Sequence, residues 1–228
     1  MTPLYEDNHI IIVNKVAGEI VQGDKTGDAP LSDIVKAYLK EKYNKPGEVF
    51  LGVVHRLDRP VSGIVVFAKT SKALTRLNEM FRKGEVHKTY HAIIPKHNQL
   101  TATNAPVLLT HYLTRNEKQN KAYAFTKEVQ GSKKATLDYK LLQSSDRYAL
   151  IQVNLHTGRH HQIRCQLATA LAPIKGDLKY GSPRSNPDGS ICLHARKVNF
   201  IHPVSKQEIN ITAPYPTLPI WSIFTCKI

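Results

Sequence analysis

Short apolar runs, most of them rich in β-branched residues, recur along the chain and are bounded by polar or turn-forming residues. This pattern is typical of strands, because a pleated and partly buried segment favours such side chains. The runs predicted to be strands cover residues 9–14, 50–54, 64–67, 85–94, 135–142 and 148–155. In the last of them Ala149, Ile151 and Val153 alternate with other residues, as one buried face of a strand requires.

Other segments carry apolar residues at the three- and four-residue spacing of an amphipathic helix. These segments cover residues 31–39, 73–81 and 163–171. The first helix is expected to end at Asn44-Lys-Pro-Gly47, where proline and glycine interrupt the pattern. The second is expected to begin near Thr70-Ser71 and to end at Gly84. The element content is therefore a mixture of strands and helices, and periodicity alone does not give their topology.

The length of the chain and its net charge indicate its domain organisation and its kind of partner. At 228 residues the chain suits one large domain or two small subdomains that share a core. Its 32 lysines and arginines outnumber its 18 acidic residues, which gives a formal net charge of +14. Such an excess favours a nucleic-acid partner, and an enzyme acting on some other anionic substrate is the alternative.

The cysteines and the N-terminus indicate a cytoplasmic protein. Cys165, Cys192 and Cys226 are odd in number and far apart, with no C-x-x-C spacing, so we expect reduced thiols. The chain begins without a basic segment followed by an apolar one, and no apolar run approaches the length of a membrane span. Export and membrane insertion are not expected.

Most of the candidate chemistry lies between two predicted strands, in residues 55–63. His55, Arg56, Asp58 and Arg59 stand close together before a Pro-x-Ser-Gly turn. Two arginines beside Asp58 would keep its carboxylate ionised, which makes Asp58 a candidate nucleophile and not a proton donor. The alternative is an arginine–aspartate ion pair that braces the turn.

The string around Asp58 resembles the catalytic motif of the RluA family of pseudouridine synthases. That motif is His-Arg-Leu-Asp, then x-x-Ser-Gly and an apolar strand ending in Ala-Lys, as in residues 55–69. Two further blocks of the family are matched by Lys88-Thr-Tyr90-His-Ala92 and by Leu155-His-Thr-Gly-Arg-His-His-Gln-Ile-Arg164. Weaker matches are Gly176-Asp177 with Tyr180-Gly181, Leu193-His-Ala195 and Ala213-Pro-x-Pro216. Two positions depart from the pattern. Val16 stands where the family usually has proline, and Gln166 stands where it often has histidine.

The resemblance implies an α+β fold with a long, curved, mostly antiparallel mixed sheet in two halves, flanked by helices and loops. Residues 1–228 would form one catalytic domain of two subdomains sharing that sheet, with no N-terminal RNA-binding domain. The expected activity is isomerisation of uridine to pseudouridine in tRNA or rRNA by a cytoplasmic monomer. Neither a cofactor nor a metal ion is expected.

The resemblance also implies roles for particular residues. Asp58 would be the nucleophile, and Arg164 would orient it with a planar charged fork. Tyr90 would stack on the target uracil and, less readily, act as a base. Arg56 would fill the space left when the uridine is extruded. The remaining residues expected to bind substrate are His55, Arg59, Arg159, His161 and Gln162. Whether Asp58 attacks C1′ of the ribose, attacks C6 of the base or assists a glycal path is left open.

Residues 96–135 are rich in charge and admit two interpretations. The basic residues there include Arg115, Lys118, Lys121, Lys127, Lys133 and Lys134. They would either contact RNA or face water on a solvated hairpin, since a charge-rich run usually faces solvent.

Four other interpretations are weaker. His156, His160 and His161 with Cys165 could share a metal ion, but no carboxylate or second cluster completes a site. His55, Asp58 and Ser62 could form a hydrolase triad, but no G-x-S-x-G motif supports it. A non-catalytic RNA-binding protein would not need Asp58, Tyr90 and Arg164 together, and a phosphodiesterase using the histidines would cut its RNA.

Overall fold

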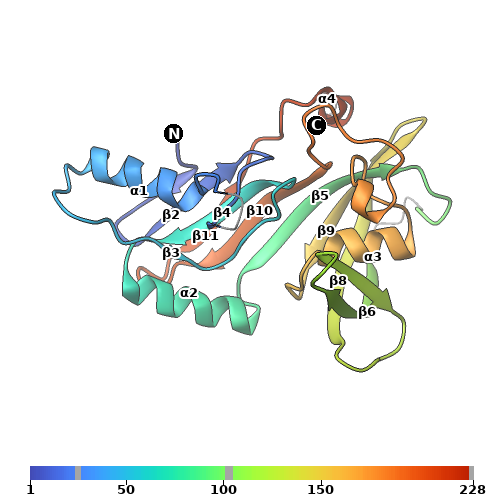
Figure 1. Ribbon diagram of the computed structural model, residues 1–228, viewed down its shortest axis with the longest axis horizontal. Coiled ribbons are helices and arrows are strands. Elements are labelled where there is room, and N and C mark those ends of the chain that lie inside the picture. The colour runs from blue at the N-terminus through green and yellow to red at the C-terminus, as the bar shows by residue number, and fades with distance from the viewer. Residues whose placement is uncertain (24–26, 101–104, 226–228) are drawn as a thin grey trace. The chain divides into compact units, whose positions relative to one another are not determined.

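A computed structural model describes residues 1–23, 27–100 and 105–225, so Cys226 lies outside the described residues. Within these ranges eleven strands and four α-helices form two compact units (Figure 1). The first unit contains residues 1–86 and 195–214, and the second contains residues 87–194 and the chain from Tyr215 onward. Every strand pair with a defined register is antiparallel.

The first unit is a sheet in the order β1-β2-β4-β10, with β11 on β10 and β3 on β4. Its strands are β1 (Tyr5–Glu6), β2 (Ile10–Lys15), β3 (Gly52–Val53), β4 (Ser62–Ala68), β10 (Leu193–Ile201) and β11 (Glu208–Thr212). β10 starts in the second unit, because Leu193 and His194 belong to it. All residues of β4 are buried, so both faces of this strand are covered. Figure 1 shows the covering helices, α1 (Leu31–Lys42) and α2 (Ser71–Lys83), on opposite sides of the sheet.

The predicted limits of α2 are confirmed in detail. The side chain of Thr70 accepts a hydrogen bond from the Ala73 amide at 3.2 Å, which caps the first turn. Gly84 ends the helix in the left-handed conformation with φ of 76°. Ala73 and Leu77 pack on Ile64 and Val66 of β4, so the apolar face of α2 is core.

The predicted strand at residues 50–54 is wrong in its extent. Only Gly52 and Val53 pair with the end of β4, opposite Ala68 and Phe67. Phe50 precedes the strand and is 47% exposed. A two-residue pairing leaves no partner strand for the residues on either side, so the apolar pattern there does not become a longer strand.

The second unit is a sheet in the order β5-β9-β8-β6-β7. Its strands are β5 (His87–Pro95), β6 (Val107–Asn116), β7 (Lys121–Phe125), β8 (Lys133–Ser144) and β9 (Tyr148–Leu155). The helices are α3 (Gln162–Ala170), a short 3-10 helix η1 (Leu178–Tyr180) and α4 (Pro219–Thr225). Cys165 of α3 packs on Leu113, Ala122 and Ala135, which places α3 against β6, β7 and β8.

These observations confirm the α+β class and the mostly antiparallel sheet. The charge-rich segment contains the hairpin of β6 and β7, and residues 101–104 of it lie outside the described ranges. Contact of this hairpin with RNA stays a prediction, as does the single-domain organisation. No helix in the described part of the chain is long and apolar enough to cross a membrane.

Gly63 gives the fold a testable constraint. Its φ is 115°, and a Cβ atom there would stand 2.4 Å from the backbone oxygen of Ala195 on β10. We expect Gly63→Ala to lower the free energy of unfolding by more than about 2 kcal/mol, since both the backbone and β10 must shift. Gly84→Ala is the control, because φ is 76° and nothing lies within 4 Å, so only the left-handed strain of about 1 kcal/mol remains. Equal losses in urea unfolding would contradict the close approach of β4 and β10.

Candidate active site

In the first unit Lys15, the last residue of β2, holds the loop that carries Asp58. Lys15 is 0% exposed. Its Nζ donates to the backbone oxygens of Val16 at 3.0 Å, Arg59 at 3.1 Å and Val61 at 2.7 Å. The Val61 amide in turn donates to the Asp58 carbonyl at 3.0 Å. One ammonium group thus holds the end of β2 and both sides of the turn after Asp58.

Burial has an electrostatic cost at Lys15. Loss of water lowers the pKa of its ammonium to about 8, while the negative charges of Glu19 and Asp58 act in the opposite direction. Asp58 is therefore close enough to influence this buried charge. The sequence interpretation assigned Lys15 no role, although a lysine at the end of an apolar strand, three residues before a glycine, was the available signal.

Each arginine beside Asp58 has a partner in the segment before α1. Arg59 Nη1 pairs with Asp28 Oδ2 at 2.6 Å, and Arg56 Nη1 donates to Gln22 Oε1 at 3.3 Å. Arg56 is exposed and Arg59 is half-buried. Asp58, half-buried between them, thus lies on a loop whose neighbouring side chains are already oriented.

His55 is an internal anchor of the same loop. Its Nε2 accepts a hydrogen bond from the Val66 amide at 3.0 Å, and its ring stacks on Phe81 with a centroid distance of 4.9 Å. A nitrogen that accepts from the backbone cannot also take a proton from Ser62. Nε2 is therefore not available as the base of a hydrolase triad, and direct contact of His55 with substrate stays a prediction.

In the second unit Tyr90 lies on the sheet face that α3 covers. The register places Tyr90 opposite Val153, and Val153 opposite Tyr139, so these three share one face. Lys88 precedes Tyr90 on this face, and its Nζ lies 3.8 Å from where a Cβ of Gly158 would be. Burial lowers the pKa of Lys88. The start of β5 and the turn before α3 thus meet at one end of the sheet.

That turn is closed by Gln162. The amide of Arg159 donates to Gln162 Oε1 at 3.0 Å, and the hydroxyl of Thr157 donates to the same oxygen at 2.8 Å. Gln162 Nε2 donates to the Thr136 carbonyl on β8 at 3.1 Å. His161 has φ of 51° at the start of α3 and bonds the Tyr180 hydroxyl at 3.0 Å.

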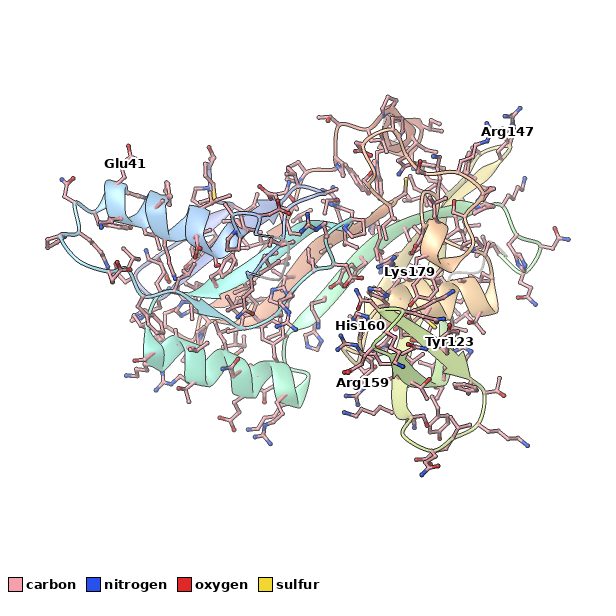
Figure 2. The ribbon with its side chains drawn as sticks, viewed as in Figure 1. Glu41, Tyr123, Arg147, Arg159, His160 and Lys179 are labelled. Atoms are coloured by element: carbon pink, nitrogen blue, oxygen red, sulfur yellow. The ribbon has the colours of Figure 1, made fainter. Side chains whose placement is uncertain are left out.

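The predicted substrate contacts of this turn therefore divide into two kinds. Gln162 and His161 are 3% and 8% exposed and bonded within the protein, which favours positioning over direct contact with RNA. Arg159 is exposed, with its Nε bonded to the Lys134 carbonyl at 3.2 Å, and lies beside His160 in Figure 2.

Arg164 forms a two-bond ion pair with Asp177 that the sequence interpretation missed. Nε donates to Oδ2 at 2.7 Å and Nη2 donates to Oδ1 at 2.8 Å, and the two residues are 4% and 1% exposed. The guanidinium carbon also lies 5.2 Å from the centre of the Tyr180 ring. The Gly176-Asp177 and Tyr180-Gly181 blocks were visible in the sequence, but nothing in them named Arg164 as their partner.

The candidate catalytic residues are thus divided between the units, with Asp58 in the first and Tyr90 and Arg164 in the second. The structure brings Tyr90 and Arg164 into one unit, with the turn before α3 beside the start of the strand that carries Tyr90. The pairing of Asp58 with Arg164 stays a prediction.

Two of the histidines and Cys165 of the metal interpretation have separate hydrogen-bond partners. His156 pairs with Asp138 at 2.7 Å, His161 with Tyr180, and Cys165 Sγ donates to the Ala122 carbonyl at 3.3 Å. Burial raises the pKa of Cys165 to about 11, so the thiol stays neutral and is a poor metal ligand. Among the described residues no group of three or more histidine, cysteine or acidic side chains is arranged to hold a metal ion.

The family model described as RNA pseudouridylate synthase matches residues 9–169, which include the Asp58 loop, Tyr90 and the turn before Arg164. The chain belongs to the RNA pseudouridylate synthase family. Among the similar curated proteins is the ribosomal large subunit pseudouridine synthase C of Vibrio cholerae, 30% identical over 92% of this chain. The ribosomal large subunit pseudouridine synthase D of Xanthomonas campestris is 31% identical over 93%. The chain spans 64% and 65% of the length of these two relatives.

A solved structure supports the same fold. The human RNA pseudouridylate synthase domain containing 4 aligns with a TM-score of 0.77 over 97% of this chain and 91% of its own, at 22% identity. The family resemblance inferred from the motifs around Asp58 is therefore confirmed.

The buried ammonium of Lys15 predicts a pH-dependent stability. Because its pKa falls from 10.5 to about 8 on folding, the unfolded chain holds a proton that the folded chain lacks between these pH values. Stability should therefore rise with pH across that window relative to Lys15→Met, in which the group is absent. Urea unfolding of both proteins at pH 7, 9 and 10.5 measures this difference. Parallel stability curves would contradict the account of Lys15.

The Arg164–Asp177 pair predicts a non-additive stability cycle. Asp177→Asn and Arg164→Met each leave one buried charge without its partner, and each should cost about 3 kcal/mol or more. Replacing both partners, in Arg164→Met with Asp177→Leu, should cost less than the sum of the two single changes. Glu79→Gln, which breaks an exposed pair with Lys83, is the control and should leave the urea midpoint unchanged. Additive losses would show that the pair is not energetically coupled.

Proposed function

We propose that this protein is an RNA pseudouridine synthase, an isomerase that converts uridine to pseudouridine without a cofactor or metal ion. The single observation that supports this most is the Asp58 loop. It presents a carboxylate between two oriented arginines and is held by the Lys15 ammonium at three backbone oxygens. The loop lies inside the segment that the family model matches.

The reaction breaks the bond from N1 of uracil to C1′ of ribose and forms a bond from C5 to C1′. The base must turn in place, the proton on C5 leaves and N1 gains a proton. Asp58 is the nucleophile, attacking C1′ or C6 or assisting a glycal path, so a covalent or ion-paired intermediate keeps the detached base from leaving. The isomerisation needs no electron donor and no group donor.

The other proposed residues hold the substrate and the nucleophile. Tyr90 stacks on the detached uracil, and Arg56 replaces the stacking that the extruded uridine leaves behind. Arg164 pairs with Asp58 through its Nη1 side, because Asp177 occupies the Nε and Nη2 edge. Asp177 is thus a positioning residue. Arg159 and Arg59 contact the phosphates near the target, and His55, His161 and Gln162 fix the loops that carry these arginines.

The names of the two curated relatives favour ribosomal RNA of the large subunit as the substrate to test first, with tRNA second. We place the enzyme in the cytoplasm as a monomer. A non-catalytic RNA-binding protein is the alternative, and the same experiment distinguishes the two.

The experiment compares pseudouridine maps of total RNA from cells that lack the protein and carry either the wild type or Asp58→Asn. We expect at least one pseudouridine to vanish in the deletion and to return with the wild type only, because asparagine keeps the volume but is not a nucleophile. Asp58→Asn should bind RNA within about tenfold of the wild type, since it removes no contact to the phosphates. Restoration by Asp58→Asn would refute the mechanism, and unchanged maps would refute the function.

A further inference from the structure

A recess in the first unit combines exposed aromatic rings with lysines at a distance from the catalytic loop. It has a volume of about 170 Å³. Its lining consists of Asn8, Leu39, Tyr43, Lys45, Val49, Phe50 and Lys69. Leu39 belongs to the C-terminal part of α1, where Figure 2 labels Glu41.

The inner wall of this recess is fixed by Glu6. Its carboxylate accepts hydrogen bonds from Lys42 at 2.8 Å, Lys69 at 2.8 Å, and the Tyr38 and Tyr43 hydroxyls at 3.0 and 2.7 Å. Burial alone would raise the pKa of Glu6, but these donors lower it to about 2, so the carboxylate stays charged at any physiological pH. The ammonium of Lys69 is thereby held 4.8 Å from the centre of the Tyr43 ring. Glu6 offsets part of the charge of Lys42 and Lys69, and this network orders the wall before any ligand arrives.

The outer groups are exposed and suit three parts of one nucleotide. Phe50 is 47% exposed and offers a ring face for stacking. Asn8 is exposed, and its amide can both donate to and accept from a base edge. Lys45 is exposed, and its backbone amide bonds the Lys40 carbonyl at 3.1 Å. Its ammonium has no hydrogen-bond or ion-pair partner among the described residues, so it is available for a phosphate.

We propose that this recess binds one unpaired nucleotide of the RNA substrate, with the base on Phe50, its edge at Asn8 and its phosphate at Lys45. This inference rests on the proposed function for the identity of the ligand as RNA. Its volume of about 170 Å³ is below the roughly 300–1,000 Å³ of pockets that enclose a whole small molecule, so it suits one planar base and not a folded ligand. A paired base cannot reach the ring, so the site is specific for single strands.

The recess is separate from the catalytic loop along β4. Asp58 lies before the first residue of β4, and Lys69 follows its last residue. A strand from Ser62 to Ala68 spans about 20 Å at 3.3 Å per residue. The nucleotide bound in the recess is therefore several nucleotides away from the target uridine along a stacked RNA strand. Such a contact would select RNA in which the target lies a defined distance from an unpaired segment.

The test uses fluorescein-labelled dodecauridylate as an unstructured probe and a twelve-base-pair RNA duplex as its counterpart, with fluorescence anisotropy as the readout. Phe50→Ala should weaken binding of the single strand about fivefold or more and leave duplex binding unchanged, because one stacked base is lost. Phe50→Tyr keeps the ring and should restore binding to within about twofold. Lys45→Ala should reduce the slope of log affinity against log salt by about 0.7, the value for one phosphate contact on a single strand.

The matched controls are Ile34→Ala and Lys40→Ala, two exposed residues of α1 outside the lining, and both should bind like the wild type. Equal binding by Phe50→Ala and Ile34→Ala, or an equal loss on the duplex, would overturn the inference. Isomerisation of uridine in a large-subunit rRNA fragment is measured on the same preparations. If the enzyme is active and Phe50→Ala binds like the wild type, only the recess is refuted. A wild type that is inactive both on this fragment and on tRNA refutes the proposed function, and ring-dependent binding would then still support the recess.

Discussion

The buried ammonium of Lys15 is the interaction on which the proposed catalytic loop depends. A charged group without water is costly unless hydrogen bonds replace its hydration. Here three backbone oxygens do so, and two of them belong to Arg59 and Val61, one and three residues after Asp58. The same contact that makes burial tolerable therefore fixes the backbone of the loop. The negative charge of Asp58 adds to the stabilisation of the ammonium, so strand and carboxylate are coupled.

In the second unit a buried charge is stabilised by an ion pair. Arg164 is almost inaccessible to water and is held at two atoms by Asp177, with Tyr180 against its guanidinium plane. A buried pair adds little net stability against apolar packing, but it fixes geometry. An arginine already oriented by one carboxylate can receive a second without reorganisation, which is the condition for electrostatic stabilisation of a reacting group. Its neighbours His161 and Gln162 lock the turn from which α3 starts.

The features that could be predicted from the sequence are local ones. Thr70 and Gly84 delimit α2 because a cap and a left-handed glycine act on adjacent residues, and the alternation in 148–155 reports one buried face directly. The strand predicted at Phe50 was too long, because pairing depends on a distant strand that the run itself does not encode. Lys15 and Asp177 were missed for the same reason. Their partners lie 44 to 46 and 13 residues away, and no spacing rule connects them.

The central claim is that this chain moves a glycosidic bond from N1 to C5 of uridine. Since that step removes the hydrogen on C5, the most direct measurement uses RNA with tritium at C5 of uridine and the purified wild-type protein. The account predicts release of one tritium to water for each pseudouridine formed, with the RNA unchanged in length. Shortened RNA would indicate strand cleavage, and RNA that is bound without release of tritium would contradict the account and leave a binding protein.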